Sequence, residues 1–403
     1  RLTRRTVLAA AASLPWLLPA GARAAEAPLR IGQSTALSGP LGDLGQAMHQ
    51  GARACIAAVN AKGGVNGRPI ELQVKDDAYD VKRGVANAEA FMDDRDCFAL
   101  FNCMGTPIIE ATLPKVLESG VPYFAPFTGA LLARPKARNV MNIRASYPDE
   151  AEQLVQHLAT IGIRKIGIAY QNNAFGKEVY EGARIAMEKH GIKDALAVTV
   201  ENNASDAGTA AGKLAAAAPE AVLVGLAGKP TLDFVKAIRA QRRGLPLYAL
   251  SIMGAAATLR ALGDDATGIA VTQVVPSPTS TVHQVVRDFQ LAWKAAGVEI
   301  EPSHLALEGY INARAFCEVL RRAGRNPTRQ AFIDAAWNLK KHDLGGFELN
   351  FTEPGRNASR FVELTMVGKG GRFIRGASRI RTELTRGFPR NVGAKTTKRQ
   401  SSA

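Results

Sequence analysis

The sequence lacks the short motifs that mark most enzymes. Its six histidines are scattered, with no pair at the spacing of metal ligands and no His-Glu-x-x-His motif. It contains no Gly-x-Ser-x-Gly nucleophile elbow, no phosphate-binding P-loop and no Gly-x-Gly-x-x-Gly turn. These absences remove the usual signatures of zinc proteases, serine hydrolases and nucleotide-binding enzymes. We therefore expect no catalytic residue, no metal site and no cofactor.

Cysteine is also scarce, with four in the chain. Cys97 and Cys103 flank the apolar run Phe98–Phe101, which is predicted to be a strand. A strand rises about 3.3 Å per residue and would hold the two roughly 20 Å apart, whereas a disulfide needs α-carbons within about 7 Å. That pair is therefore excluded. Cys55 and Cys317 lie in helical patterns with apolar neighbours, and we expect mostly buried, free thiols.

Long hydrophobic runs are missing as well. The first residues are basic and then apolar through Leu18, and Ala22-Arg23-Ala24 follows as a small-x-small cleavage site. This pattern predicts an export signal over residues 1–24, too short in its apolar part to span a membrane. The order Thr-Arg-Arg-x-Val-Leu is similar to a twin-arginine signal, with an ordinary secretory signal as the alternative. No other window has about 18 apolar residues, so we expect a soluble periplasmic protein.

The positive charge invites a nucleic-acid interpretation that its distribution does not support. Of the formal charge of +15, residues 1–24 contribute +4 and residues 379–403 contribute +6, which leaves +5 for the body. That is ordinary for a globular chain, and no basic-aromatic interleaving or helix-turn-helix pattern appears. We expect no nucleic-acid partner. The basic tail, 379–403, is expected to be disordered and solvated, with contact to an acidic membrane surface as the alternative.

What the sequence does contain is clearest from Leu29 to Asp80. A short apolar strand leads into a Gly/Pro turn, a helix with apolar residues at helical spacing ends at Gly63-Gly64, and the strand Ile70–Val74 follows. A helical crossover of this length normally returns a parallel strand. Ligand crevices of such sheets lie at the carboxyl ends of the strands. Gln33, Ser34 and the turn 38–45 are therefore candidate lining.

The alternation of strands and helices runs through residues 29–142 and restarts after Pro148. Two successive units of this kind predict an α/β chain of two doubly wound parallel-sheet domains. The segment Pro276–Ser280 is predicted to be a linker. The remaining elements are three helices and two strands, at His283–Ala296, His304–Arg322 and Thr328–Asn338, and around Phe347–Asn350 and Phe361–Met366.

Two hydroxyl-bearing turns follow neighbouring predicted strands, Gly105-Thr106-Pro107 and Thr128-Gly129-Ala130. A turn that opens a helix offers free N–H groups at the positive end of the helix dipole, so the two turns together can hold one carboxylate. Simple N-caps are the alternative. The acids Asp76, Asp77 and Asp80 superficially match a magnesium motif. We interpret them as a strand end followed by the start of a helix, where the dipole favours acids.

In their order and spacing, Leu37-Ser38-Gly39-Pro40, Gly51-Ala52, Asn60, Gly63 to Arg68 and Asp76-Asp77 resemble the type I periplasmic binding proteins, specifically the branched-chain amino acid receptors of ABC importers. The resemblance continues to about Phe373. It implies three crossovers between lobes, at 144–148, 275–280 and 341–346. The first lobe would hold 25–144 and 279–341, and the second 145–278 and 342–378. Such a hinge permits closure around a ligand.

The same resemblance implies the binding residues. In these receptors both turns contact the ligand's carboxylate and ammonium, which makes Gly105, Thr106, Thr128, Gly129 and Ala130 candidate ligand contacts. Tyr147 lies in the first crossover, where a phenol can reach a ligand between the lobes. Phe175 falls where the family often places a ligand-covering aromatic, although it can also simply staple the following helix. Some relatives carry a disulfide cysteine where this chain has Tyr79, so we expect that bridge to be absent.

Three departures from the family pattern bear on the ligand. Receptors for α-amino acids usually add a carboxylate near the position of Met253, and aromatics near those of Leu226 and Leu44. A buried ammonium without a charge partner costs several kcal/mol. We therefore expect a ligand with an acidic head and an apolar body, such as an aromatic or branched acid, with branched-chain amino acids as the alternative.

The function that the resemblance implies is a monomeric solute receptor that delivers its ligand to an ABC permease. A ligand-sensing module that signals to a membrane partner is the alternative. A periplasmic enzyme has only the acid motif in its favour.

Overall fold

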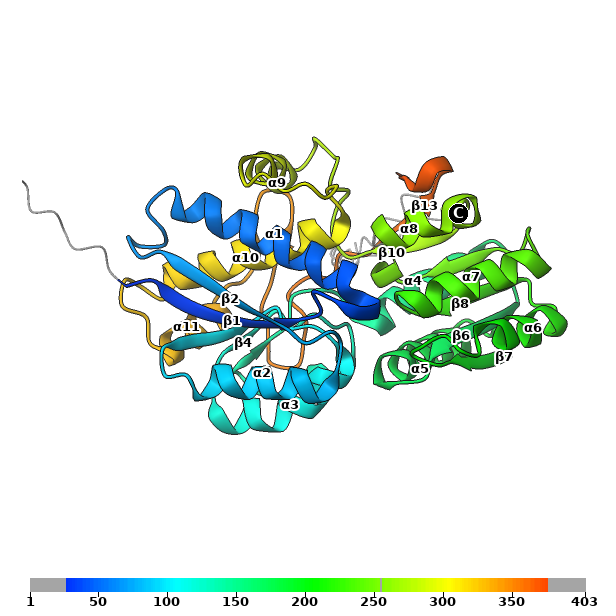
Figure 1. Cartoon of the computed structure of the whole chain (residues 1–403), viewed down its shortest axis with the longest axis horizontal. Coiled ribbons are helices and arrows are strands. Elements are labelled where there is room, and N and C mark those ends of the chain that lie inside the picture. The colour runs from blue at the N-terminus through cyan, green and yellow to red at the C-terminus, as the bar shows by residue number, and fades with distance from the viewer. Residues whose placement is uncertain (1–26, 254–255, 376–403) are drawn as a thin grey trace, which may run out of the picture.

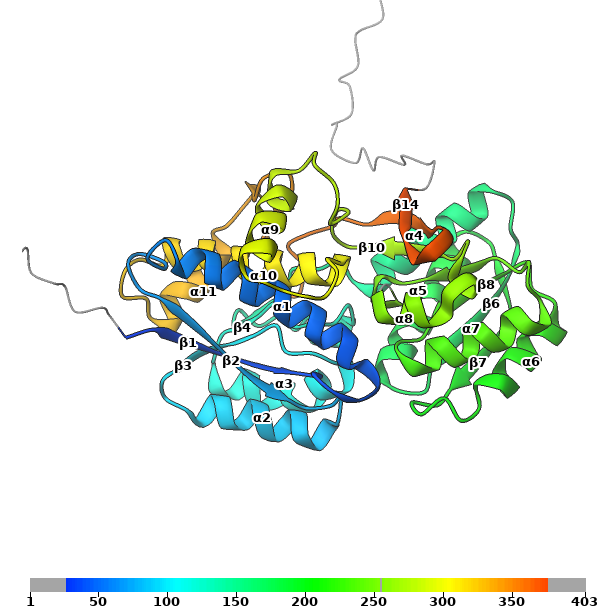
Figure 2. The same cartoon turned by 45° about the horizontal axis from the view of Figure 1, so that its top comes forward.

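The computed structural model describes residues 27–253 and 256–375, which form two lobes side by side (Figures 1 and 2). The predicted export signal (1–24) and basic tail (379–403) lie outside the described residues. All four cysteines lie within them and are buried and free, as predicted.

The first lobe is built on a five-stranded, fully parallel sheet. Its strands, in spatial order, are β2 (Ile70–Asp76), β1 (Leu29–Thr35), β3 (Cys97–Phe101), β4 (Tyr123–Phe124) and β5 (Val140–Met141). Helices α2 (Val81–Asp93) and α3 (Thr106–Ser119) cover one face, and α1 (Gly42–Asn60) and α10 (His304–Arg322) cover the other (Figures 1 and 2). Both faces of a parallel sheet must be covered in this way, because its strands are apolar on both sides.

The second lobe has a seven-stranded sheet. Its strands, in spatial order, are β14 (Phe373–Arg375), β13 (Glu363–Val367), β10 (Ala270–Gln273), β9 (Leu247–Ala249), β8 (Ala221–Gly225), β6 (Lys165–Gln171) and β7 (Lys193–Val200). β13 pairs antiparallel with β10 and with β14, and the other pairs are parallel. Its helices are α4 (Tyr147–Thr160), α5 (Ala174–Lys189), α6 (Ala207–Ala217), α7 (Lys229–Gln241) and α8 (Ala256–Leu262).

The two sheets repeat one strand order. In the first lobe it is β2-β1-β3-β4-β5 and in the second β7-β6-β8-β9-β10, so in both the order reverses beside the first strand of the lobe. In doubly wound sheets, ligands bind in the crevice at the carboxyl ends of the strands that flank this reversal. The predicted fold class is confirmed. The strands predicted at Ile70–Val74, Phe98–Phe101 and around Phe361–Met366 match β2, β3 and β13 to within a few residues, whereas α8 and the short 3₁₀ segments were not predicted.

The third crossover lies later than predicted. The sequence places it at 341–346, but Phe347, Leu349, Phe351 and Ala358 pack in the core of the first lobe with α9 (Gln284–Ala295), α10 and α11 (Arg329–Trp337). The backbone N–H of Ala358 donates to the carbonyl oxygen of Asn142 at 2.9 Å, which ties the segment to the end of β5. The short hairpin of β11 (His342–Asp343) and β12 (Glu348–Leu349) extends this part of the first lobe. The chain therefore enters the second lobe only at 360–362, just before β13.

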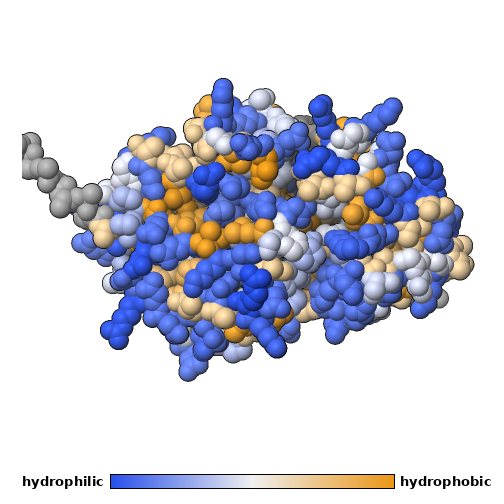
Figure 3. Space-filling model, viewed as in Figure 1, coloured by the Kyte–Doolittle hydropathy of each residue, from blue (hydrophilic) through white to orange (hydrophobic). Residues whose placement is uncertain are grey.

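No helix within the described residues is long and apolar enough to cross a membrane. Hydrophilic side chains protrude over both lobes on the face shown in Figure 3, with apolar residues in patches between them. The apolar mass of the protein lies instead around the sheets and between the lobes.

Helices α1 and α10 pack closely because glycines face each other across their contact. A Cβ placed on Gly309 would lie 2.0 Å from the carbonyl oxygen of Met48, and one on Gly51 would lie 1.8 Å from that of Ala306. Both distances are far inside van der Waals contact, so neither position accepts a side chain without moving a helix. The close packing of α1 on α10 fixes the position of α1, and with it the place where its first turn, which includes Leu44, meets the second lobe.

We predict that Gly309→Ala destabilises the protein by roughly 2–3 kcal/mol, because the added methyl group meets backbone rather than a side chain that can rotate away. Gly208→Ala is the matched control, since Gly208 is an exposed position in α6 with nothing near its Cβ. The control is expected to gain up to about 1 kcal/mol from helix propensity. Urea unfolding followed by circular dichroism measures both, and equal stabilities would contradict the packing account.

Candidate functional site

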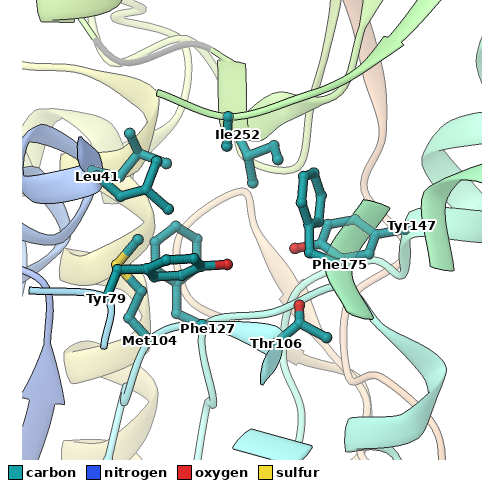
Figure 4. Close-up of a pocket in the computed structure, with 11 residues that line it drawn as sticks. Leu41, Tyr79, Met104, Thr106, Phe127, Tyr147, Phe175 and Ile252 are labelled. Carbon is teal, nitrogen blue, oxygen red and sulfur yellow. The ribbon is translucent and has the colours of Figure 1, made fainter. Parts of the chain in front are cut away.

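A pocket lies between the lobes at the carboxyl ends of both sheets, close to the point where each strand order reverses (Figure 4). Residues from the first lobe, the first crossover and the second lobe line it: Leu41, Leu44, Tyr79, Met104, Gly105, Thr106, Phe127, Tyr147, Phe175, Ala227 and Ile252. Its volume is only about 20 Å³, close to what one water molecule needs. A solute larger than water can therefore enter only after the lobes or their side chains separate.

The positive end of α3 points into this pocket. Gly105 is its N-cap, adopts φ 104° and has no side chain to accept from the first-turn N–H groups. Thr106 follows, and its Oγ1 lies 2.7 Å from Oγ1 of Thr128. The Thr128 oxygen in turn accepts from the N–H of Ala130 at 3.1 Å. A helix N-terminus with free N–H groups and a hydroxyl is suited to a carboxylate.

The rest of the pocket is apolar and aromatic. Tyr147 opens α4 and meets Phe175 of α5 edge to face, with ring centroids 5.2 Å apart. Leu41 and Leu44 come from the turn after β1 and the start of α1. Ile252 of the second lobe lies across the pocket from Leu41 (Figure 4). Among the described residues that line the pocket none carries a formal charge. Its polar contacts are confined to hydroxyl groups and backbone.

Five residues predicted from the sequence line this pocket: Leu44, Gly105, Thr106, Tyr147 and Phe175. Three more stand directly behind it. Thr128 pairs with Thr106, Ala130 is fully buried, and Gly129 makes room for the Tyr147 ring, because a Cβ there would lie 2.4 Å from Cδ1 of Tyr147. The Gly129 carbonyl also accepts from the Tyr147 N–H at 2.8 Å. The second turn therefore positions Tyr147.

The predictions that Leu226 and Met253 contact the ligand were wrong. Both pack in the core of the second lobe and neither lines the pocket. Their neighbours Ala227 and Ile252 line it instead. Leu226 directly follows β8, where successive residues point to opposite sides of the sheet. Met253 ends a short 3₁₀ segment, Ser251–Met253, whose middle residue faces the pocket. In both places an error of one residue in the alignment exchanges a core position for a pocket position. Gln33 and Ser34 also lie inside the first lobe, where Gln33 pairs with His49 and Ser34 donates to Asp77.

The sequence did not point to Leu41, Tyr79, Met104, Phe127, Ala227 or Ile252 as individual site residues. Tyr79 carried a signal, since this chain has a tyrosine there, two residues after Asp77, where some relatives have a cysteine. The acids themselves are structural, as interpreted. Asp76 Oδ1 accepts from the N–H groups of Leu37 and Ala78 at 2.8 and 2.9 Å, and Asp80 caps α2 through the N–H of Arg83 at 2.9 Å. The hydrogen bond from Ser38 lowers the pKa of Asp76 to about 2.

A buried ionic cluster lies behind the aromatic wall of the pocket. Arg144 of the first crossover forms ion pairs with Glu150 of α4 at 3.3 Å and with Glu308 of α10 at 3.6 Å. Its guanidinium carbon stands 5.4 Å from the centre of the Phe127 ring and 5.8 Å from that of Tyr147. The two carboxylates come from different lobes, so this single arginine connects the lobes at the hinge.

The members of this ionic cluster differ in how many of their polar atoms form hydrogen bonds. Glu150 accepts from the Ser251 N–H at 2.8 Å and the Thr272 hydroxyl at 2.6 Å, and Arg144 also donates to Ser251. Nε and Nη1 of Arg144 form no hydrogen bond within the described part of the chain. Burial raises the pKa of Glu308 to about 6, with Arg144 opposing the rise and Glu150 adding to it. Glu308 therefore takes up a proton at a higher pH than an ordinary glutamate.

Polar contacts at the rim also join the lobes. The carboxylate of Glu178 in α5 accepts from the backbone N–H groups of Leu131 and Leu132 at 3.0 and 3.3 Å. On the other side, the Thr258 hydroxyl donates to Asp43 at 3.3 Å. These contacts are few and near the surface, and such contacts contribute little individually. They suit an interface that opens and closes.

A second hollow, of about 400 Å³, lies on the second lobe alone. Arg239, Arg243, Asp264, Asp265, Thr267 and Lys369 line it. Several of these residues come just before β10 in the chain, so the hollow lies at the amino ends of the strands. The usual ligand crevice lies at the opposite edge of the sheet. Arg239 donates to the carbonyls of Arg243 and Leu245, both at 2.7 Å, and is held by its own lobe. The hollow between the lobes is the better candidate.

A family model described as periplasmic binding protein matches residues 28–372 of this chain. The chain belongs to the periplasmic binding protein family.

A substrate-binding periplasmic protein from Ralstonia solanacearum has a similar structure, with 32% identity and a TM-score of 0.80, over 86% of this chain and 100% of that one. Leu/Ile/Val-binding protein homolog 7 of Brucella abortus is 25% identical over 76% of this chain and 80% of its own length. Homolog 3 of Brucella melitensis is 27% identical, and the match spans 51% of this chain and 56% of that protein. These relatives are binding proteins rather than enzymes, and this chain is a solute-binding protein of the same family.

For this periplasmic binding protein, the hinge cluster predicts a pH-dependent stability. Because the pKa of Glu308 is raised to about 6 in the fold, its contribution is full at low pH and is lost as the pH rises through about 6. Glu308→Gln cannot ionise and removes this dependence. The free energy of unfolding of the wild type, relative to the variant, should fall by about 1 kcal/mol between pH 5 and pH 8. Parallel pH profiles in urea unfolding would show that Glu308 titrates normally.

Proposed function

We propose that this protein is the solute receptor of an ABC importer, that it is exported to the periplasm, and that it captures a small carboxylate with an apolar body between its two lobes. The observation that carries the proposal is the composition of the pocket. Its polar groups are the N-terminus of α3 and three hydroxyl-bearing side chains, and the remaining lining is apolar. A site with convergent donors amid apolar walls is typical of small-molecule binding.

The head group follows from the donors. The N-terminus of α3 and the Thr106 hydroxyl favour negative charge. An ammonium group would meet no acid in the lining. The buried carboxylates nearest the hinge, Glu150 and Glu308, are already paired with Arg144 behind the Phe127 and Tyr147 rings. An α-amino acid would therefore bury its charge without a partner, at a cost of several kcal/mol.

Capture follows from the hinge. The pocket is too small for a solute in the present arrangement, and the rim contacts between the lobes are few. The ligand enters when the lobes separate, binds α3 through its head, and is covered by Phe175 and Ile252 as the second lobe returns. The closed form then docks on the permease as a monomer.

Branched-chain amino acids are the second candidate, because the curated relatives carry Leu/Ile/Val-binding names. 4-Methylpentanoate and leucine separate the two candidates cleanly, since they differ only in the amino group. We predict that 4-methylpentanoate or benzoate binds at least about tenfold more tightly than leucine in isothermal titration. Tight leucine binding with no response to either acid would replace the carboxylate proposal with the amino acid one.

Removing the hydroxyl at the end of α3 tests where the head group binds. Thr106→Val should weaken carboxylate binding by about tenfold or more, because hydrogen bonds to charged groups contribute about 1.5–3 kcal/mol. Thr112→Val in the same helix is the control, since the Thr112 hydroxyl donates to the carbonyls of Ile108 and Ile109 and does not line the pocket. Equal affinities for the two variants in titration calorimetry would show that the carboxylate does not bind at the N-terminus of α3.

A further inference from the structure

Tyr79 occupies the pocket through an unusual backbone. It follows β2, and both Ala78 (φ 49°) and Tyr79 (φ 62°) adopt the left-handed conformation. This conformation costs a non-glycine residue of order 1–3 kcal/mol and persists only where neighbouring groups hold it. Here two carboxylates hold it, because Asp76 accepts from the N–H of Ala78 and Asp77 from the N–H of Tyr79, both at 2.9 Å.

The turn aims the Tyr79 ring at the cap of α3. A Cβ on Gly105 would lie 2.8 Å from Cε2 of Tyr79, so the ring rests directly on the glycine that opens the helix. Figure 4 shows the hydroxyl groups of Tyr79, Tyr147 and Thr106 pointing toward the same part of the pocket. They come from three different segments: the turn after β2, the first crossover and the start of α3.

The Tyr79 hydroxyl has no hydrogen-bond partner in the described part of the chain. Its backbone N–H donates to Asp77, whereas its hydroxyl group points into the pocket (Figure 4). Burial raises the pKa of Tyr79 well above its ordinary value, and Tyr147 and Asp77 add to the rise. The phenol therefore stays protonated and keeps a free donor in the pocket at all physiological pH values.

We propose that Tyr79 determines the choice of head group: its hydroxyl donates to the ligand's carboxylate and, with Thr106 and the N-terminus of α3, stabilises that charge without a cation. This inference rests on the proposed carboxylate binding and assigns the discrimination to one residue. A neutral carboxamide accepts less strongly than a carboxylate, so removal of the phenol penalises the acid more than the amide.

The test measures the affinity of the wild type and of a variant for two ligands that differ in head group. Tyr79→Phe is titrated with 4-methylpentanoate and with 4-methylpentanamide, which have the same body and different head charge. The variant should lose about 10- to 100-fold in affinity for the acid and no more than about threefold for the amide. Tyr180→Phe is the control, because Tyr180 stacks on Tyr170 in the second lobe, with centroids 4.8 Å apart, and does not line the pocket.

The outcomes separate this inference from the proposed function. An unchanged affinity of Tyr79→Phe for the acid, or an equal loss for acid and amide, overturns the role of Tyr79 while wild-type carboxylate binding stands. A wild type that binds no carboxylate overturns both. Thermal unfolding confirms that the variant is folded. If Tyr79→Phe fails to fold, Tyr79→Cys removes the same phenol and is read by the same comparison of ligands.

Discussion

The direction of the strands is the constraint on which the rest of this structure depends. Parallel strands joined by helices bring all their carboxyl ends to one edge of the sheet, and a crevice opens there where the strand order reverses. This chain does so twice with the same order. The three crossovers then bring the two edges face to face. The pocket residues, drawn from both lobes and from the first crossover, meet because of this arrangement rather than because of any local motif.

The second feature of the design is how it keeps formal charge out of the pocket. Arg144, the arginine of the first crossover, is paired with both Glu150 and Glu308. The rings of Phe127 and Tyr147 lie between that cluster and the pocket. Fixed dipoles line the pocket instead: hydroxyl groups and a helix end. Dipoles of this kind stabilise an anion and offer little to an ammonium group. The cluster itself joins the lobes at the hinge. The Phe127 and Tyr147 rings therefore contact the hinge cluster and also line the pocket.

The sequence predicted the parts of this arrangement that depend on local pattern. Strand and helix spacing gave the two α/β lobes, and the Gly105-Thr106 and Thr128 turns were found because hydroxyl-bearing turns after strands are visible in sequence. Leu226 was misplaced by one residue because adjacent positions at a strand end face opposite ways. Met253 was misplaced by one residue within a short 3₁₀ segment, whose local pattern does not show which residue faces the pocket. Residues 342–358 were assigned to the second lobe by mistake, because their packing against α11 and β5 leaves no periodic pattern in the sequence. Tyr79 was missed as a site residue because its direction depends on two left-handed residues held by distant hydrogen bonds.

The most direct test of this account is a crystal structure with 4-methylpentanoate or benzoate bound between the lobes. The account predicts a carboxylate oxygen about 3 Å from the Thr106 N–H or hydroxyl and a second contact of similar length from the Tyr79 hydroxyl. The apolar body should lie against Leu44, Phe175 and Ile252. A ligand with its carboxylate toward the second lobe, away from α3, would contradict the account.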